Sequence, residues 1–182
     1  MKKFWFATAF ALVAVWALGA GNPGLSQTAP QDKAGKNTAT EDKAAIEALE
    51  QRYSKAFNSR NVEAIMANYA PASQVFVFDA VPPREYANWE AYKKDWEGLF
   101  AEYPGPLKNE IAELNITVVG TVAYAHHVET GYFTRKNGSK LEITVRVTDV
   151  FRKFNGKWLI VLEHVSFPVD LETGKADLLS KK

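Results

Sequence analysis

The sequence predicts an α+β protein in which three helices come first and a curved antiparallel sheet follows. Apolar residues recur at helical spacing from about residue 41 to residue 103, as in helices that bury one face. After Pro106 they alternate with polar residues over four long stretches, as in strands with one buried face. Asn137-Gly138 and Asn155-Gly156 separate the last three stretches and predict hairpin turns.

The N-terminus has the pattern of a secretory signal peptide, which we place over residues 1–27 with an uncertain cleavage site. Lys2 and Lys3 form a basic start, Phe4 to Leu18 is an apolar run, and small residues follow. The run is short for a membrane span, so a retained N-terminal anchor is the less favoured alternative. We therefore expect an exported protein, periplasmic or secreted, with no membrane association after cleavage.

Composition divides the rest of the chain into three parts. Residues 28–40 are polar and predict a flexible linker, residues 41–170 suffice for one domain with a core, and residues 171–182 read as a loose tail. With 22 Lys and Arg against 21 Asp and Glu, the balance favours neither nucleic acid nor an anionic membrane as a partner. The absence of Cys excludes disulfides, thiol nucleophiles and thiolate metal sites.

Start signals and apolar stripes place the helices. Thr40, followed by two acidic residues, predicts the cap of the first helix, whose buried stripe includes Tyr53. Asn61 predicts the start of a second helix, which Pro71 ends. A third helix follows, and its inward stripe is aromatic: Trp89, Tyr92, Trp96 and Phe100.

The strands follow from alternation and from turn residues. A short strand is expected over residues 75–78, with Asp79 at its end and Pro82-Pro83 breaking regular structure soon after. The four long strands are expected at residues 107–119, 121–135, 139–154 and 158–169.

Asp149 lies in a strand in phase with apolar residues, so it points at the buried face. An unpaired carboxylate there would cost several kcal/mol, roughly, so we expect it to be partnered or protonated. A protonated acid in a dry pocket is a candidate functional group. The alternative is a structural acid that pairs with Arg84, with Arg146 or with a partner subunit.

Three segments resemble ketosteroid isomerase: Gln51-Arg52-Tyr53 through Asn58, the strand ending in Asp79, and Thr148-Asp149-Val150-Phe151. The order of helices and strands resembles the nuclear transport factor 2-like fold. The last third of the chain is more similar to SnoaL-like proteins and to the association domain of calcium/calmodulin-dependent kinase II. The resemblance covers about residues 41–170 and implies a cone-shaped fold that encloses one pocket. This fold carries enzymes as well as pure scaffolds.

By position, the resemblance implies three catalytic groups. Asp79 matches the base that moves a proton on the substrate, while Tyr53 and Asp149 match a phenol and a protonated acid that donate to the enolate oxygen. Such donors suit an oxyanion because both can be aimed into a water-poor site. The alternatives are a core aromatic for Tyr53 and a turn cap for Asp79. No cofactor is implied.

Further pocket residues are expected on the sheet and on the third helix. The family's register places His126 and Val128 toward the pocket and His127 on the opposite face. A satisfied sheet histidine is the alternative for His126. Trp89 and Trp96 are expected in the pocket wall, where their rings would contact a ligand.

The face taken by the last strand depends on the hairpin at Asn155-Gly156. A two-residue turn would place His164 on the pocket side. A three-residue turn would shift the pairing of Asp149 by one residue and place Glu163 and Val165 there instead. The family favours the second arrangement, so we expect Val165 in the pocket and His164 on the outer face.

The functional expectation is an isomerase or cyclase that transfers protons on a small apolar carbonyl compound without a cofactor. The alternative is a non-catalytic exported module of the same fold that binds a ligand or assembles other components. The resemblance also implies a homodimer through the outer sheet face. No metal site is expected, because His126, His127 and Glu129 alternate faces and at most two could share one ion.

Overall fold

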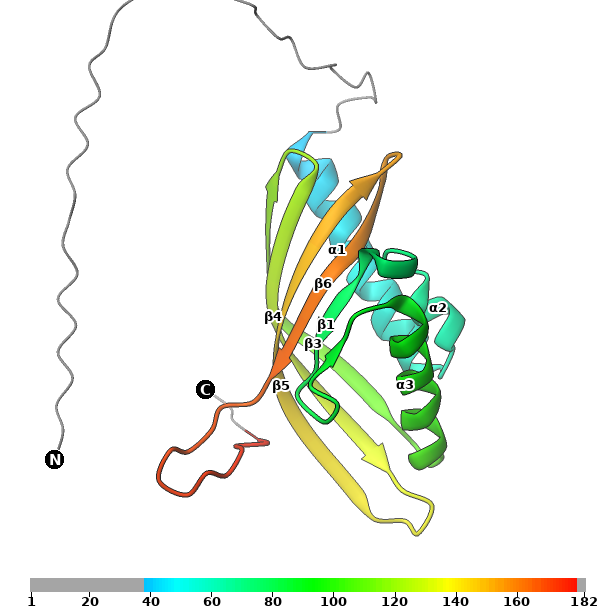
Figure 1. Ribbon diagram of the computed structural model, residues 1–182, viewed down its shortest axis with the longest axis vertical. Coiled ribbons are helices and arrows are strands. Elements are labelled where there is room, and N and C mark those ends of the chain that lie inside the picture. The colour runs from blue at the N-terminus through cyan, green and yellow to red at the C-terminus, as the bar shows by residue number, and fades with distance from the viewer. Residues whose placement is uncertain (1–37, 180–182) are drawn as a thin grey trace, which may run out of the picture. The chain divides into compact units, whose positions relative to one another are not determined.

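The computed structural model describes residues 38–179, so the expected signal peptide and most of the expected linker lie outside the described residues. Within this range, three α-helices lie on one face of a curved sheet, as the sequence predicts; the sheet has six strands, one more than predicted (Figure 1). None of the helices in the described range is long and apolar enough to cross a membrane.

Helix α1 (Ala39–Asn58) begins at a capping box one residue upstream of its first turn, and not at Thr40 as predicted. The Thr38 hydroxyl accepts from the Glu41 N–H at 3.2 Å, and the Glu41 carboxylate accepts from the Thr38 N–H at 2.7 Å. Because these two bonds satisfy donors that the helix itself leaves free, Thr38 is the better cap and Thr40 lies within the first turn.

The other two helices begin at asparagine caps. Helix α2 (Val62–Met66) follows Asn61 as predicted, but it ends well before Pro71. Helix α3 (Trp89–Glu102) follows Asn88, whose side-chain oxygen accepts from a backbone N–H of the first turn at 2.9 Å. An asparagine side chain in this position satisfies a backbone donor that would otherwise be free, which fixes where each helix starts.

The strands are β1 (Phe76–Phe78), β2 (Glu85–Tyr86), β3 (Lys108–Val119), β4 (Val122–Thr134), β5 (Lys140–Phe154) and β6 (Lys157–Ser166). They form one sheet in the order β2-β1-β6-β5-β4-β3. The four long strands pair antiparallel and agree with the predicted ranges to within a few residues. Strand β1 pairs with β6 in parallel, which was not predicted, and carries Asp79 to the edge of the inner sheet face.

The β4–β5 hairpin does not turn on Asn137-Gly138 alone. The Arg135 N–H donates to the Ser139 carbonyl at 2.9 Å, and Gly138 has a positive φ of 81°. The loop therefore has three residues between this bonded pair, with glycine in the left-handed position that such a loop requires. Compared with a two-residue turn, the register shifts by one residue.

This register decides which histidine points inward. Asp149 pairs with Ala125, and the inner face of β4 carries His127, which is 3% exposed, whereas His126 is exposed. The expectation that His126 and Val128 face the pocket is therefore wrong, because a shift of one residue turns every side chain of a strand to the other face.

The β5–β6 hairpin does form a two-residue turn, with positive φ at both Asn155 and Gly156. Beyond it, Val161 has no partner on β5, so a β-bulge shifts the register by one residue. Asp149 consequently pairs with Glu163, which is buried, and His164 is exposed on the outer face. The expected faces are correct, although a bulge and not a three-residue turn produces them.

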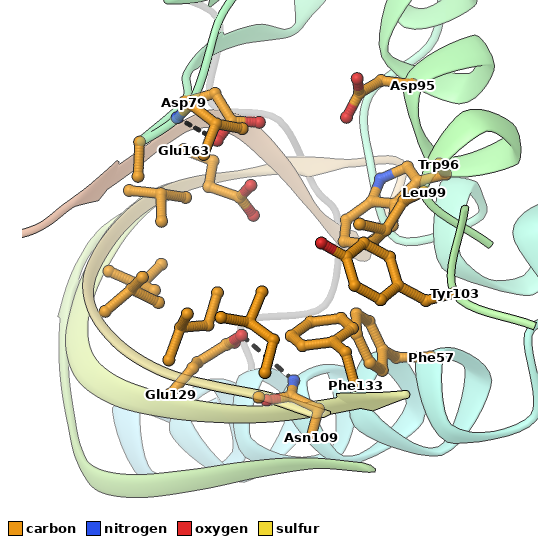
Figure 2. Close-up of a pocket in the computed structure, with 18 of the residues that line it drawn as sticks. Phe57, Asp79, Asp95, Trp96, Leu99, Tyr103, Asn109, Glu129, Phe133 and Glu163 are labelled. Carbon is orange, nitrogen blue, oxygen red and sulfur yellow. Dashed lines mark hydrogen bonds between the residues drawn. The ribbon is translucent and has the colours of Figure 1, made fainter. Parts of the chain in front are cut away.

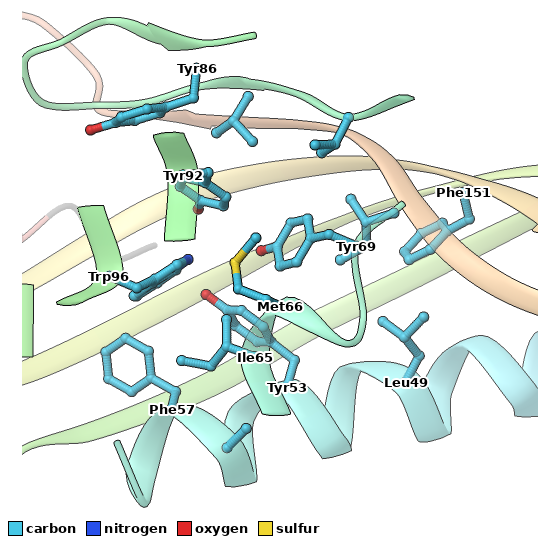
Figure 3. Close-up of a cluster of buried hydrophobic side chains, with 14 of the residues drawn as sticks. Leu49, Tyr53, Phe57, Ile65, Met66, Tyr69, Tyr86, Tyr92, Trp96 and Phe151 are labelled. Atoms are coloured by element: carbon cyan, nitrogen blue, oxygen red, sulfur yellow. The ribbon is translucent and has the colours of Figure 1, made fainter. Parts of the chain in front are cut away.

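Aromatic side chains fill the space between the helices and the inner sheet face (Figure 3). Phe57 of α1 and Trp96 of α3 meet edge to face, with ring centroids 5.6 Å apart. Tyr69 meets Tyr92 of α3 in the same way at 5.4 Å, and Tyr53 lies 6.4 Å from Tyr69. Such contacts fix ring orientations, and they bring three phenol groups into one core.

Part of the tail that was expected to be loose, residues 171–182, forms backbone hydrogen bonds, at Gly174, Lys175, Asp177 and Leu178. It folds back on itself, and the Leu178 carbonyl accepts from the Thr144 N–H at 2.7 Å. Strand β6 ends at Ser166, so this bond lets the tail occupy part of the β5 edge that β6 leaves open.

Candidate functional site

A cavity of about 390 Å³ lies between α3, the loop after β1 and the inner face of the sheet (Figure 2). This volume is typical of small-molecule sites. Four of the predicted site residues line it: Tyr53, Asp79, Trp96 and Val165. Four do not: Trp89, His126, Val128 and Asp149.

Trp89 was expected in the pocket wall and packs elsewhere. It is the first residue of α3, and its indole N–H donates to the Met66 carbonyl at 3.1 Å. The Lys93 ammonium lies over the Trp89 ring, 5.5 Å from its centroid. The side chain therefore joins α3 to α2, whereas Trp96, two turns further along α3, reaches the cavity.

Glu163 is the buried acid of the cavity wall. The Tyr92 hydroxyl donates to one of its carboxylate oxygens at 2.5 Å, and the Tyr69 hydroxyl donates to the other at 2.6 Å. Burial raises the pKa of Glu163 to about 7; the two phenols oppose this rise, and the negative charges of Glu129 and Asp79 add to it. A carboxyl group with such a pKa can give or take a proton at neutral pH.

Glu129 of β4 lines the cavity away from Glu163 (Figure 2). The Asn109 side-chain amide donates to one of its oxygens at 3.1 Å, and the His127 Nε2 atom lies 3.0 Å from the other. These two partners fix the orientation of the Glu129 carboxylate.

Asp79 lies at the cavity rim, directly after β1. Burial raises its pKa, the Val81 N–H that reaches its carboxylate at 3.2 Å opposes the rise, and the charge of Asp95 adds to it. The residue predicted to be the base thus lines the cavity, and the parallel pairing of β1 with β6 brings it close to Glu163 (Figure 2).

Behind the cavity wall lies a second group of polar side chains, Glu50 of α1, His127 of β4 and Asp149 of β5, which we name the sealed cluster. His127 Nδ1 is 3.7 Å from an Asp149 oxygen. Each residue has a buried atom without a hydrogen-bond partner among residues 38–179. Burial raises the pKa of Glu50 to about 8 and that of Asp149 well above its ordinary range.

The sealed cluster offers three atoms within 4.8 Å of one another, two carboxylate oxygens and an imidazole nitrogen, a donor set that a divalent metal accepts. The alternative is that the cluster holds protons in place of a metal, because the raised pKa values of Glu50 and Asp149 favour the protonated carboxyl groups. Burial lowers the pKa of His127, but its contact with Glu129 and the surrounding carboxylates outweigh burial, and the net shift is upward.

The three predicted catalytic groups therefore do not meet at one point. Tyr53 and Asp79 line the cavity, and burial raises the pKa of Tyr53, which keeps it a phenol. Asp149 is 1% exposed and its raised pKa favours the neutral acid, as expected, but it belongs to the sealed cluster. Glu163 takes the place at the cavity that the resemblance gave to Asp149.

Comparison with known proteins fits this fold and this cavity. Residues 46–170 match the SnoaL-like domain. The chain belongs to this family. The match excludes the N-terminal segment and spans all of the helices except the first turns of α1, together with all six strands. No curated protein matches the sequence.

Solved structures confirm the nuclear transport factor 2-like fold. A protein of this fold from Pseudomonas putida KT2440, of unknown function, has 28% identity and a TM-score of 0.71 over 80% of this chain and 100% of its own. A superfamily member from Salmonella enterica serovar Typhimurium has 19% identity and a TM-score of 0.67 over 77% and 100%. A Xanthomonas campestris structure, named as a calcium/calmodulin-dependent protein kinase II association domain, has 25% identity and a TM-score of 0.57 over 72% and 88%.

Proposed function

We propose that this SnoaL-like protein binds a small apolar carbonyl compound in the cavity and transfers a proton on it, with Glu163 as the acid/base group. The arrangement of Glu163 carries the proposal. It lines the cavity, two phenols hold its two oxygens at 2.5 and 2.6 Å, and its pKa is about 7. General acid/base groups work best when their pKa lies near the working pH.

The proton transfer needs no oxidant, reductant or cofactor. Ionised Glu163 takes a proton from the carbon beside the substrate carbonyl, and the electron pair of that C–H bond moves into an enolate. Protonated Glu163 then returns the proton to another carbon, so atoms and charge balance. The Tyr53 hydroxyl would donate a hydrogen bond to the enolate oxygen. Asp79 would serve as a second carboxylate at the rim.

Proton exchange tests this proposal directly. The protein is incubated with cyclic enones in D₂O, and NMR follows exchange of the protons beside the carbonyl. We expect Glu163→Gln to slow exchange by about 100-fold or more, while Glu172→Gln, a matched change at an exposed tail residue, leaves the rate unchanged. Equal rates for Glu163→Gln and the wild type would contradict the proposal.

A non-catalytic binding or assembly module is the second candidate. The 25% identity to the association-domain structure favours it. Light scattering on the full chain tests the homodimer through the outer sheet face, where Tyr124 is 47% exposed. A dimer that Tyr124→Glu dissociates, together with no enone exchange, would favour assembly over catalysis. Export of the protein stays a prediction.

A further inference from the structure

The charge of the cavity wall is one-sided. Five of its lining residues are acidic and none is Lys, Arg or His; the acids are Asp79, Asp95, Glu102, Glu129 and Glu163. Asp79 and Glu163 lie together at one side of the cavity, and Asp95 faces them from α3 (Figure 2). A concave wall with one sign of charge attracts a ligand of the opposite sign.

Within the described part of the chain, three of the five acids of this wall have no basic partner, whereas Glu129 lies 3.0 Å from the His127 Nε2 atom. Among residues 38–179, Asp79, Asp95 and Glu163 make no ion pair. Arg135 reaches Glu102 at 3.7 Å, and water weakens this ion pair because the two side chains are 40% and 60% exposed. The negative charge of Asp79 adds to the upward pKa shift of Glu163, and that of Asp95 adds to the upward pKa shift of Asp79. A bound cation would relieve this repulsion.

The rest of the wall is aromatic and aliphatic. Its aromatic residues are Tyr53, Phe57, Tyr92, Trp96, Tyr103, Phe133 and Phe167. Faces of such rings attract organic cations, most strongly where water is excluded.

We propose that the cavity binds an organic cation, a hydrophobic amine or quaternary ammonium compound whose charge lies near Glu163 and Asp79 and whose apolar body contacts the aromatic wall. This inference rests on the proposed function in one respect, namely that this cavity is the ligand site. The inference restricts the proposed substrates to carbonyl compounds that also carry a positive charge. The acid/base role of Glu163 and the charge of the ligand can fail separately.

Two probes of the same shape test the charge alone. Benzyltrimethylammonium and neopentylbenzene differ in one central atom, which is a charged nitrogen in the first and a neutral carbon in the second. Titration of the full chain, followed by tryptophan fluorescence and by calorimetry, compares their affinities. We expect the cation to bind at least tenfold more tightly. Equal affinities, tighter binding of the neutral probe, or no binding of either would overturn the inference.

Variants then locate the charge. We expect Glu163→Gln and Asp79→Asn each to reduce the preference for the cation severalfold, while Glu172→Gln leaves it unchanged. Asp79 lies at the rim, so its variant keeps the test valid even if Glu163→Gln fails to fold. A preference that survives Asp79→Asn and a folded Glu163→Gln overturns the inference.

The two proposals are separable by outcome. Cation preference without enone exchange would support the ligand class and contradict catalysis by Glu163. Enone exchange with equal affinity for the two probes would support catalysis and overturn the ligand class.

Discussion

Glu163 and Asp149 pair directly across β6 and β5, yet their surroundings differ. Both are almost fully buried, with exposed fractions of 5% and 1%. Glu163 lines the cavity and accepts two phenol hydrogen bonds, whereas Asp149 lies in the sealed cluster and has an oxygen without a partner. The pair therefore compares two carboxyl groups in one core, one with donors and access to a ligand and one without either.

The difference shows that the surroundings of a buried carboxyl group decide whether it can ionise. Donors to a carboxylate stabilise its charged form, so the phenols keep Glu163 able to ionise near neutral pH despite burial. Among residues 38–179 one Asp149 oxygen has no donor and the other has only His127 Nδ1 at 3.7 Å, so burial and the nearby acids raise its pKa and favour the neutral form. A neutral acid away from the cavity contributes to packing and to the pH dependence of stability, while the ionisable one can act on a ligand.

The largest expected effect separates the two carboxyl groups in catalysis. Asp149→Asn keeps the volume and the neutral state of the side chain, so we expect enone exchange to stay within tenfold of the wild-type rate. Glu163→Gln should lose about 100-fold or more. NMR exchange rates measured side by side decide this. A large loss of exchange rate in Asp149→Asn, with an unchanged melting temperature, would show that the catalytic carboxyl group is Asp149 in the sealed cluster and not Glu163.

The next effect is on stability, because the sealed cluster holds protons that the unfolded chain releases. The pKa of Glu50 is about 8 in the folded protein against an ordinary 4.5. Between these pH values the folded state binds more protons than the unfolded state, so the free energy of unfolding should fall as pH rises. The raised pKa of His127 acts in the same direction.

Glu50→Gln checks this sign. Glutamine cannot ionise. As the pH rises from 5 to 8, we therefore expect the free energy of unfolding of the variant to increase by roughly 2–4 kcal/mol relative to that of the wild type. Urea unfolding at several pH values measures the two slopes. Glu172→Gln at the exposed tail is the matched control and should keep the wild-type slope. Parallel curves for Glu50→Gln and the wild type would show that Glu50 ionises normally.

A smaller effect tests the phenols. Tyr69→Phe or Tyr92→Phe removes one hydroxyl that donates to Glu163 and favours its charged form. We expect each variant to raise the pKa of Glu163 above about 7 and to cost about 1–3 kcal/mol of stability. The pH profile of enone exchange reports the first change and urea unfolding the second. Tyr124→Phe, on the outer face, should change neither the pH profile nor the stability. An unshifted pH profile in both Tyr69→Phe and Tyr92→Phe would show that the phenols do not control the pKa of Glu163.

Much of the fold follows from periodicity in the sequence. The aromatic stripe of α3 and the alternation along β3 to β6 depend only on local spacing, and the structure agrees with both. The two-residue strand β2 gives no periodic signal, and the parallel pairing of β1 joins segments far apart in the chain. Contacts of this kind depend on tertiary packing, which spacing does not report.

The site was harder to predict because it depends on register. Both Asn-Gly pairs predict hairpins, but only Asn155-Gly156 forms a two-residue turn, while Gly138 ends a three-residue loop. A bulge at Val161 then shifts the last strand. Glu163 carried the same signal as Asp149, an acid within an apolar strand, but spacing alone left its face open, and only the resemblance favoured the pocket side.

The register itself can be tested at the two adjacent histidines, where the smallest effect is expected. His126 is exposed on the outer face, so His126→Ala should change the free energy of unfolding by no more than about 0.5 kcal/mol. His127 is buried and 3.0 Å from Glu129, so His127→Ala should cost clearly more, since it removes one of the two partners of the Glu129 carboxylate and opens a void. Urea unfolding of both variants at one pH compares them. A larger loss at His126 would mean that β4 faces the core in the opposite register, and Glu129 would then lie outside the cavity.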